Sequence, residues 1–474
     1  MISRHNQTPK EESFSKWYNR AIRDAGLIAD SPTQGVWTLL PRAAELWNNI
    51  RNNMTRDMGA IGIREVIMPT LFPMSLLERE ADHVDGFAPE VFTVTKAGPK
   101  DLEDPLVARP TSEVVASELM KDLVTSYRDL PVTFNQWSSA FRAERRPRPL
   151  LRTTEFLWQE GYSAHGTSKE ADEHARCMAD FYAKFMEEYL CIASITGTKS
   201  DNERFPGAVA TYALEAQFGG RALQLATSHN LGNGFALSHN IKYLDKDGQL
   251  KEVYQTSWGS STRMIGALVM AHGDKDGVVL PPQVAPEVVT IIPAWRNEDD
   301  KSSVEAYVHN LRQALGDRAI IARREPGERL GPVRFRVDRG GSPIQLVVGP
   351  REIENGTASY KLRHSGGLGE INTGNTKAAI DDLNTRAACE MLAASRAKRE
   401  DSITVIDGGK QALIDAVNDG QMVLAGWSGT AVDEKLLKEQ TGGITIRVHP
   451  HNHPDRRDPL TGKSGKAAIF AKAY

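Results

Sequence analysis

"RTTEFLWQEGY", residues 152–162, has the composition and alternation of a β-strand, and we predict one there. Side chains along a strand alternate between its two faces. One face of this strand would carry Arg152, Thr154, Phe156, Trp158, Glu160 and Tyr162. Such a face is poor core material, because buried charges need partners. It is better suited to be the floor of a site for a charged, planar ligand.

Length and composition indicate a multidomain globular enzyme. The chain has 474 residues, 40% of them hydrophobic and 25% charged, which predicts two to four domains. No apolar run is long enough to span a membrane, and residues 1–20 lack the apolar core of an export signal, so we expect a cytoplasmic protein. The net charge of −3 gives no global attraction to nucleic acid. The three cysteines are scattered without CxxC spacing, which is typical of a reduced compartment and argues against a thiolate metal site.

Hydrophobic spacing predicts the order of elements. Helical spacing covers residues 11–28, 41–60, 168–190, 302–315, 376–397 and 409–420. Strand-like stretches cover residues 64–73, 131–144, 152–162, 221–229, 251–260, 287–293, 318–325, 343–349 and 466–474. Around the helix at 168–190 the order is strands, helix, strands, which favours an antiparallel α+β sheet over a doubly wound one.

A Gly/Pro-rich connector at 273–293 marks a domain boundary. We therefore expect three units, at residues 1–283, 284–400 and 401–474. The middle unit reads as a small α/β domain. The last unit is expected to have a core of its own.

A basic hairpin is predicted around residues 141–160. Phe141-Arg142-x-Glu144 precedes a loop, "RRPRPLL", and Arg152 follows it. A hairpin would place Arg142 and Arg152 on adjoining strands, where two guanidinium groups can grip a phosphate while Phe156 offers a face for a base. The alternative is a surface hairpin with ordinary ion pairs.

Two further stretches suggest ligand contacts. In "SWGSSTRMIGALVMAHGD" a strand enters an apolar helix with Arg263 at the junction, which is unfavourable unless an anion binds there. The alternative is an arginine that reaches solvent. In "ARPTSEVV", Thr111 and Glu113 would share one strand face, and a buried carboxylate there could receive an ammonium group. A capping box is the alternative.

A strand–helix element ended by proline, the FRxE…RxxxF hairpin and the late strand–helix junction with Arg263, in that order, resemble the three motifs of class II aminoacyl-tRNA synthetases. The segments "HVDGFAPEVFTVT", "RPTSE", "SYRDLP", "NQW", "LRTTEFLWQEG", "ATSHNLG" and "TSWGSSTR" are similar to prolyl-tRNA synthetases of the archaeal/eukaryote-like type, over nearly the whole chain. The resemblance implies an α+β catalytic domain at 1–283 with an antiparallel sheet flanked by helices. It also implies an α/β anticodon-binding domain at 284–400 and a small C-terminal α/β domain at 401–474. No large editing insertion separates the second and third motifs.

The resemblance further implies an activity, proline activation by ATP with Mg²⁺ and transfer to tRNA(Pro), carried out by a homodimer. The catalytic residues would be Arg142, Glu144 and Arg263. The ATP site would comprise Arg142, Glu144, Arg152, Thr153, Phe156, Gln224, Thr227, His229 and Arg263. The proline site would comprise Phe87, Thr111, Glu113, Arg142, Trp158, Glu160 and Tyr162. No side-chain nucleophile is required, because the substrate carboxylate attacks the α-phosphorus and the protein supplies position and charge.

The chain departs from the family pattern near the ligands. Tyr162 stands where the family has a histidine, Leu225-Ala226 replaces a smaller pair, and Leu150 replaces an aromatic residue. "PGERLGPVRF" replaces a tryptophan-containing loop in the middle unit. Volume changes of this kind are worth about 1–3 kcal/mol in discrimination. These substitutions leave two alternative functions open: an inhibitor-resistant paralogue of the enzyme, or a ligase that acts on a proline analogue.

The last unit lacks the zinc cysteines of the family. "GWSGT" and "DRRDPLTGKSG" occupy the two ligand regions. His449, His451 and His453 lie between prolines, a pattern more typical of a solvated loop, so zinc is not expected. The final Tyr474 is implied to fold back toward the catalytic domain. A non-catalytic synthetase-like binding protein is a second alternative, although the retained motif arginines favour an enzyme.

Overall fold

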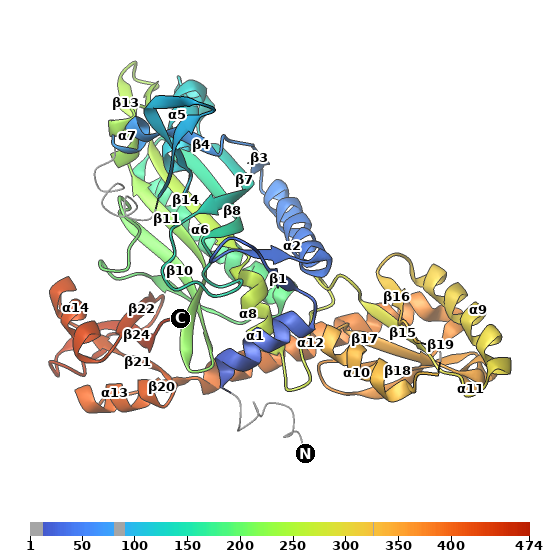
Figure 1. Cartoon of the computed structure of the whole chain (residues 1–474). Helices are drawn as coiled ribbons and strands as arrows, with labels where there is room; N and C mark the ends of the chain where they lie inside the picture. Colours follow the sequence, from blue (N-terminus) through green and yellow to red (C-terminus); the bar gives the residue numbers. More distant parts are fainter. Residues whose placement is uncertain (1–12, 80–90, 326) are drawn as a thin grey trace.

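The computed structural model describes residues 13–79, 91–325 and 327–474. A large sheet with its helices lies on the left of Figure 1, and a smaller α/β unit lies on the right. The C-terminal segment, in red, returns to the lower end of the large sheet. No helix in these described ranges is both long and apolar enough to cross a membrane.

The N-terminal part is built on an antiparallel sheet, as expected. Its strands are β7 (Val132–Phe141), β8 (Glu155–His165), β9 (Ile195–Thr198), β10 (Ala210–Phe218), β11 (Arg221–Gly232) and β14 (Tyr254–Ser261). Neighbours pair antiparallel in the order β9-β10-β11-β14-β8-β7. The short β3 (Arg64–Glu65) closes this end by pairing parallel with β7.

Two strand predictions need correction. The strand expected at 152–162 begins only at Glu155, because the chain turns at 148–152 and Leu150 has a left-handed φ of 62°. The stretch 64–73 forms two short strands instead of one. After β3 and the bend at Pro69, which has no N–H for a ladder, β4 (Leu71–Pro73) joins a separate sheet with β5 (Phe92–Ala97) and β6 (Lys100–Ala108).

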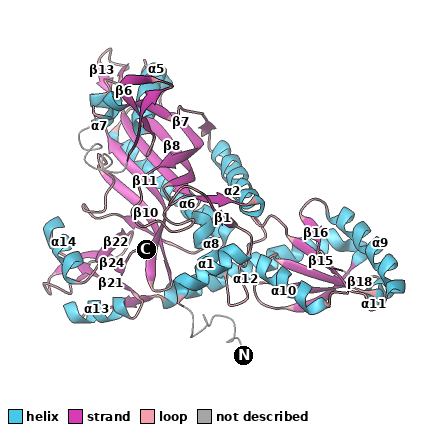
Figure 2. Cartoon of the chain, viewed as in Figure 1, coloured by secondary structure: helices cyan, strands magenta, loops and turns pink. Residues whose placement is uncertain are grey.

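Helices pack against the large sheet (Figure 2). The long ones are α1 (Phe14–Asp24), α2 (Pro41–Ala60), α5 (Glu113–Leu123), α6 (Ser168–Leu190) and α8 (Arg263–His272). The remaining small elements are β1 (Ile28–Asp30), β2 (Trp37–Leu39), α3 (Met74–Leu77), η2 (Tyr127–Asp129), α7 (Gly234–Ser238), β12 (Lys242–Leu244) and β13 (Leu250–Glu252). A capping box, in which Thr167 and Glu170 bond each other's backbone N–H, starts α6.

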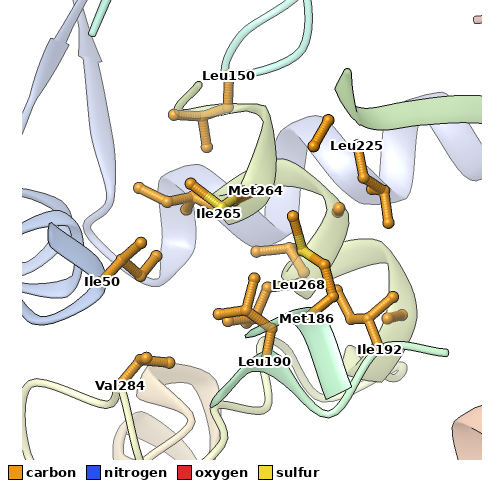
Figure 3. Close-up of a cluster of buried hydrophobic side chains, with 14 of the residues drawn as sticks. Ile50, Leu150, Met186, Leu190, Ile192, Leu225, Met264, Ile265, Leu268 and Val284 are labelled. Carbon is orange, nitrogen blue, oxygen red and sulfur yellow. The ribbon is translucent and has the colours of Figure 1, made fainter. Parts of the chain in front are cut away.

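The main core lies where α2, α6 and α8 meet. Figure 3 shows Ile50 of α2, Met186 of α6 and Leu268 of α8 in one apolar cluster. Every residue of α8 from Met264 to Ala271 is buried. Leu225, which the sequence suggested as added bulk beside a ligand, belongs to this cluster (Figure 3). The start of α8 is thus held rigidly under the large sheet.

The middle unit is a mixed five-stranded sheet with helices. Its strands are β15 (Val289–Pro293), β16 (Ala319–Ile321), β17 (Ile344–Val348), β18 (Thr357–Leu362) and β19 (Leu368–Asn372), in the order β16-β15-β17-β18-β19. Its helices are α9 (Glu298–Leu315), α10 (Leu330–Gly340), α11 (Pro350–Asn355), η3 (Thr373–Asn375) and α12 (Thr376–Asp401). Helix α10, which sequence analysis missed, occupies the place of the absent tryptophan loop; its Pro332 lies in the first turn, where proline is tolerated.

The C-terminal unit has a core of its own and shares a second apolar cluster with the large sheet. Its elements are β20 (Ile403–Val405), α13 (Lys410–Asn418), β21 (Met422–Trp427), α14 (Ala431–Gln440), β22 (Ile444–Pro450), β23 (Arg456–Arg457) and β24 (Ser464–Lys472). One apolar cluster lies within the unit. A second cluster joins Met422 and Ile469 to Ala213 and Ala222 of the large sheet. The first cluster confirms the expected core within the unit, and the second cluster shows that the unit also packs against the large sheet.

The large sheet also continues into this unit. β22 pairs antiparallel with β9 through His449 opposite Thr198 and Pro450 opposite Gly197. The full order is β20-β21-β24-β22-β9-β10-β11-β14-β8-β7-β3, with β23 beside β24. The chain ends at the start of β11, where the Tyr474 N–H donates to the Ala222 carbonyl at 3.1 Å.

Candidate active site

A cavity of about 470 Å³ opens on β8, β10, β11 and β14. All site residues expected from the sequence line it except Phe87, which lies outside the described residues. They are Thr111, Glu113, Arg142, Glu144, Arg152, Thr153, Phe156, Trp158, Glu160, Tyr162, Gln224, Thr227, His229 and Arg263. The fold thus brings together side chains from three separate parts of the chain.

Strand β8 forms the floor of the cavity. Phe156, Trp158, Glu160 and Tyr162 share its open face, as strand alternation requires. The rings of Phe156 and Trp158 meet edge to face with centroids 5.7 Å apart. The Trp158 indole donates a hydrogen bond to the Ser138 hydroxyl at 3.1 Å. Both rings are therefore fixed before a ligand arrives.

Arg142 and Arg152 stand above this floor. Arg142 donates to the carbonyl of Pro110 at 3.0 Å, and its guanidinium lies 5.3 Å from the Phe156 centroid and 5.6 Å from that of Trp158. Arg152 pairs with Glu144 at 2.9 Å. The two arginines lie in the irregular segments that flank the loop, not on paired strand positions as expected. Both nevertheless line the cavity.

Arg263 is the first residue of α8 and enters the cavity from its deep side. It donates to the carbonyls of Leu151 at 3.0 Å and Gln224 at 3.1 Å. Burial, and next the charge of Arg142, lower its pKa to about 10, so it stays a cation at neutral pH. A partly buried cation whose hydrogen-bond partners are neutral carbonyls favours binding of an anion.

Two buried carboxyl groups form the other end of the cavity. Glu160 accepts hydrogen bonds from the Ser112 hydroxyl at 2.6 Å, from the Gln136 amide at 2.5 Å and from the Tyr162 hydroxyl at 2.5 Å. Glu113 accepts one from the Thr111 hydroxyl. Burial, and then the nearby Glu160, raise the pKa of Glu113 to about 7. Glu160 thus accepts hydrogen bonds from several protein donors. Glu113 accepts fewer, so its carboxyl oxygens can still accept a hydrogen bond from a ligand.

The prediction that Thr111 and Glu113 share one strand face is wrong. Glu113 begins helix α5, so it does not share a strand face with Thr111. Ser112 is the N-cap residue but makes no side-chain cap bond, so the capping-box alternative is absent as well. Instead, the Ser112 side chain is committed to Glu160.

The wall opposite Arg142 comes from β11. Gln224 and Thr227 are partly exposed in the cavity, and His229 is buried. The His229 ring contacts the Thr211 hydroxyl at 2.9 Å and lies 4.4 Å from the Phe205 ring centroid. Burial, and then the charge of Arg142, lower the pKa of His229 to about 3, so the imidazole is neutral.

The structure adds Arg447, which sequence analysis did not select, to the cavity lining and places Tyr474 there as well. Arg447 and Tyr474 reach the cavity from the C-terminal unit. The Tyr474 hydroxyl donates to the Phe218 carbonyl at 2.8 Å, and Arg148 lies 5.7 Å from its ring centroid, so the last residue does fold back. For Arg447 there was one available signal, a lone charge inside the apolar strand "ITIRVHP". Leu150 and Leu225 also line the cavity while packing into the core.

The three C-terminal histidines have separate partners. His449 bonds the Ala467 carbonyl at 2.9 Å, His451 lies 3.3 Å from the Thr198 hydroxyl, and His453 is exposed. Among the residues that the structure describes, no three His, Cys, Asp or Glu side chains are grouped to hold a metal ion.

Comparisons with known proteins place this cavity in a family context. Residues 92–272 match the family model described as the tRNA synthetase class II core domain (G, H, P, S and T). The chain is 38% identical over 475 residues to a proline–tRNA ligase of Lachnoclostridium phytofermentans, covering 98% of each chain. It is 37% identical over 470 residues to one of Rubrobacter xylanophilus and 38% identical over 473 residues to one of Cenarchaeum symbiosum, again covering 98% of each chain.

Proposed function

The chain belongs to the proline–tRNA ligase family of class II synthetases, and we propose how its cavity activates proline with ATP and passes the prolyl group to tRNA(Pro). The observation that carries the assignment of roles is a single cavity with cations at one end and buried carboxyl groups at the other. A triphosphate and an amino acid have matching charges. We propose that the enzyme works in the cytoplasm, where tRNA is charged.

The basic end is proposed to bind ATP. Phe156 offers its ring for adenine to stack on, beside the fixed guanidinium of Arg142. Arg142 and Arg263 would neutralise the phosphates, and Glu144 would hold Arg152 through their ion pair. Thr153, Gln224, Thr227 and His229 would complete the nucleotide site.

The acidic end is proposed to bind proline. Glu113 has acceptor capacity for the secondary ammonium, and Trp158 provides an apolar surface for the ring. Glu160 and Tyr162 bond each other and would shape the pocket. Because the pKa of Glu113 is raised to about 7 in the empty cavity, the positive amine would favour its ionised form.

Catalysis would then rest on position and charge. The carboxylate of proline attacks the α-phosphorus of ATP and pyrophosphate leaves. A terminal tRNA hydroxyl then attacks the carbonyl of the adenylate, and AMP leaves as the ester forms. Arg142 and Arg263 stabilise the charge that develops on the phosphates. Magnesium ions prefer oxygen ligands and commonly bind together with substrate phosphates, and the Gln224 and Thr227 side chains would hold Mg²⁺ on the protein side. When bound, Mg²⁺ supplies further charge neutralisation.

The middle unit, residues 284–400, is proposed to bind the anticodon arm of the tRNA. In and next to α10, Arg323, Arg329 and Arg334 are exposed, and the Phe335 side chain is 50% exposed. Cations that contact phosphates beside an aromatic ring that can stack on a base are typical of RNA-binding surfaces. The replaced loop would thus still serve tRNA, with different contacts.

A homodimer is also proposed. Ile67 is 92% exposed and Ile61 is 53% exposed, on either side of the edge strand β3. An apolar surface at an unpaired sheet edge is a common association site. Sedimentation of the parent and of Ile67→Lys would test it, with a shift toward monomer expected.

The assigned reaction is tested by ATP–pyrophosphate exchange with proline and with ring analogues of proline. Arg263→Ala should reduce proline-dependent exchange by about 100-fold or more, since a preorganised cation is lost where charge develops. The exposed Arg351→Ala on α11 is the control and should retain parental exchange. Near-normal exchange by Arg263→Ala would contradict the phosphate role. A strong preference for an analogue would contradict proline as the substrate.

A further inference from the structure

A buried ionic cluster connects the C-terminal unit to the cavity. Glu215 of β10 is fully buried and accepts from Lys199 Nζ at 2.6 Å and from Arg447 Nη2 at 2.9 Å, both at Oε1. The side chains of Lys199 and Arg447 are 1% and 6% exposed. Arg447 Nη1 also lies 3.5 Å from Glu203, which is a quarter exposed at the rim. Ion pairs this deeply buried are costly and need a compensating function.

The same cluster leads to the arginine at the start of α8. Glu215 is the register partner of Gln224 across β10 and β11. The carbonyl of Gln224 holds Arg263 Nη1 at 3.1 Å. Arg447, which is held by Glu215, lines the cavity together with Arg263. A chain of contacts therefore runs from Arg447 in β22 through Glu215 in β10 and Gln224 in β11 to Arg263 at the proposed phosphate end.

Two buried polar atoms of this cluster lack hydrogen-bond partners among the described residues. Arg447 Nε and the second carboxylate oxygen of Glu215 are buried and have no hydrogen-bond partner in the described part of the chain. Buried polar atoms are nearly always paired, so such exceptions are typical of strained functional positions. Within the same ranges the hydrogen bonds of the Arg263 guanidinium go to two carbonyls, so no carboxylate is bonded directly to its positive charge.

We propose that Arg447 is a positioning residue for the triphosphate of ATP, supplied by the C-terminal unit. It anchors Glu215, keeps the Gln224 carbonyl and Arg263 in register, and adds a fixed positive charge to the wall at the phosphate end. This inference rests on the proposed function, because it requires ATP in this cavity. It predicts that a change at Arg447 acts on ATP and leaves proline binding unaffected.

The test uses the full-length protein and the variant Arg447→Met. ATP binding is measured by calorimetry, and KM for ATP and for proline by pyrophosphate exchange. Loss of one member of a coupled network should weaken ATP binding and raise KM for ATP about tenfold. KM for proline should change by less than about threefold. The control Lys466→Met removes an exposed cation from the same unit and should match the parent.

A second variant, Arg447→Lys, preserves the charge and allows a test should the methionine variant not fold. It should weaken ATP binding less than methionine does, because the charge remains but the forked geometry is lost. Equal losses for ATP and proline, or parental ATP affinity in a folded variant, would overturn the proposal. If the parent binds ATP but does not activate proline, the assigned reaction fails, and calorimetry still decides the role of Arg447.

Discussion

At the scale of single residues, Tyr162 holds the end of the cavity that contains the two buried carboxyl groups. Its ring is 2% exposed and packs 6.1 Å from the Phe134 centroid. Its hydroxyl donates to Glu160 and accepts from the Ser112 N–H at 3.0 Å. The phenol therefore lines the cavity and is also anchored by hydrogen bonds. A role in selecting among ring substituents remains a prediction.

Tyr162→Phe should raise KM for proline about tenfold, because it removes a hydrogen bond to a buried carboxylate, worth about 1.5–3 kcal/mol. KM for ATP should stay within about twofold. Tyr182→Phe is a matched control: this buried tyrosine donates to Gln159, which points from β8 to the opposite face. KM for proline is measured for both variants by titrating proline. If KM for proline in Tyr162→Phe equals that of the parent, Tyr162 does not contribute to substrate binding.

At the scale of elements, an aspartate joins the two loops that hold zinc cysteines in the resembling family. Asp458 is 1% exposed and accepts from the Ser428 N–H at 2.8 Å, the Ser428 hydroxyl at 2.7 Å and the Leu460 N–H at 2.8 Å. Burial raises the pKa of Asp458, but these hydrogen bonds outweigh it and hold the pKa below its ordinary value. The carboxylate thus connects the end of β21 to the turn before β24.

Asp458→Ala should lower the free energy of unfolding by about 1–3 kcal/mol, because buried N–H groups lose their acceptor. Asp455→Ala, an exposed neighbour, should have little effect. Urea unfolding measures both. A zinc chelator should leave the parent unchanged, since the hydrogen-bonded carboxylate makes the connection. Chelator-induced destabilisation would contradict this account.

At the scale of the whole molecule, neutral histidines that are buried or partly buried link stability to pH. Burial is the main cause that lowers the pKa of His165 and His174 to about 4 and of His229 and His272 to about 3. In the unfolded chain these groups titrate near 6.5. Below that pH the unfolded state binds protons that the folded state excludes, so stability falls as pH falls from about 6.5 to about 4. Glu113 and Glu160, with raised pKa values, act in the opposite direction but are outnumbered.

The urea midpoint should therefore decrease between about pH 7.5 and pH 5. Each histidine contributes up to about 1.4 kcal/mol per pH unit. His165→Asn should reduce this pH dependence, whereas His453→Asn, at an exposed position, should not. A pH dependence that is unchanged in His165→Asn would show that this imidazole is not held neutral by the fold.

Local patterns determined much of this protein before any tertiary contact was considered. The alternation in 152–162 predicted which side chains of β8 share the cavity face, and helical spacing predicted α2 and α6. Helix α8 was predicted as an apolar helix that follows a strand. These features depend on the periods of strand and helix, which the chain carries in each short segment. The position of Arg263 at a strand-to-helix junction was readable for the same reason. The division into units at 283 and 400 remains a prediction.

Only the tertiary structure decided what the distant segments contribute. The sequence pattern of 401–474 suggests a separate unit, yet β22 pairs with β9, and Met422 and Ile469 are buried against the catalytic sheet. That pairing brings Arg447 and Tyr474 into the cavity. The physical reason is that strand pairing and core burial depend on complementary surfaces from segments far apart in the chain, and neither period nor composition specifies such a partner.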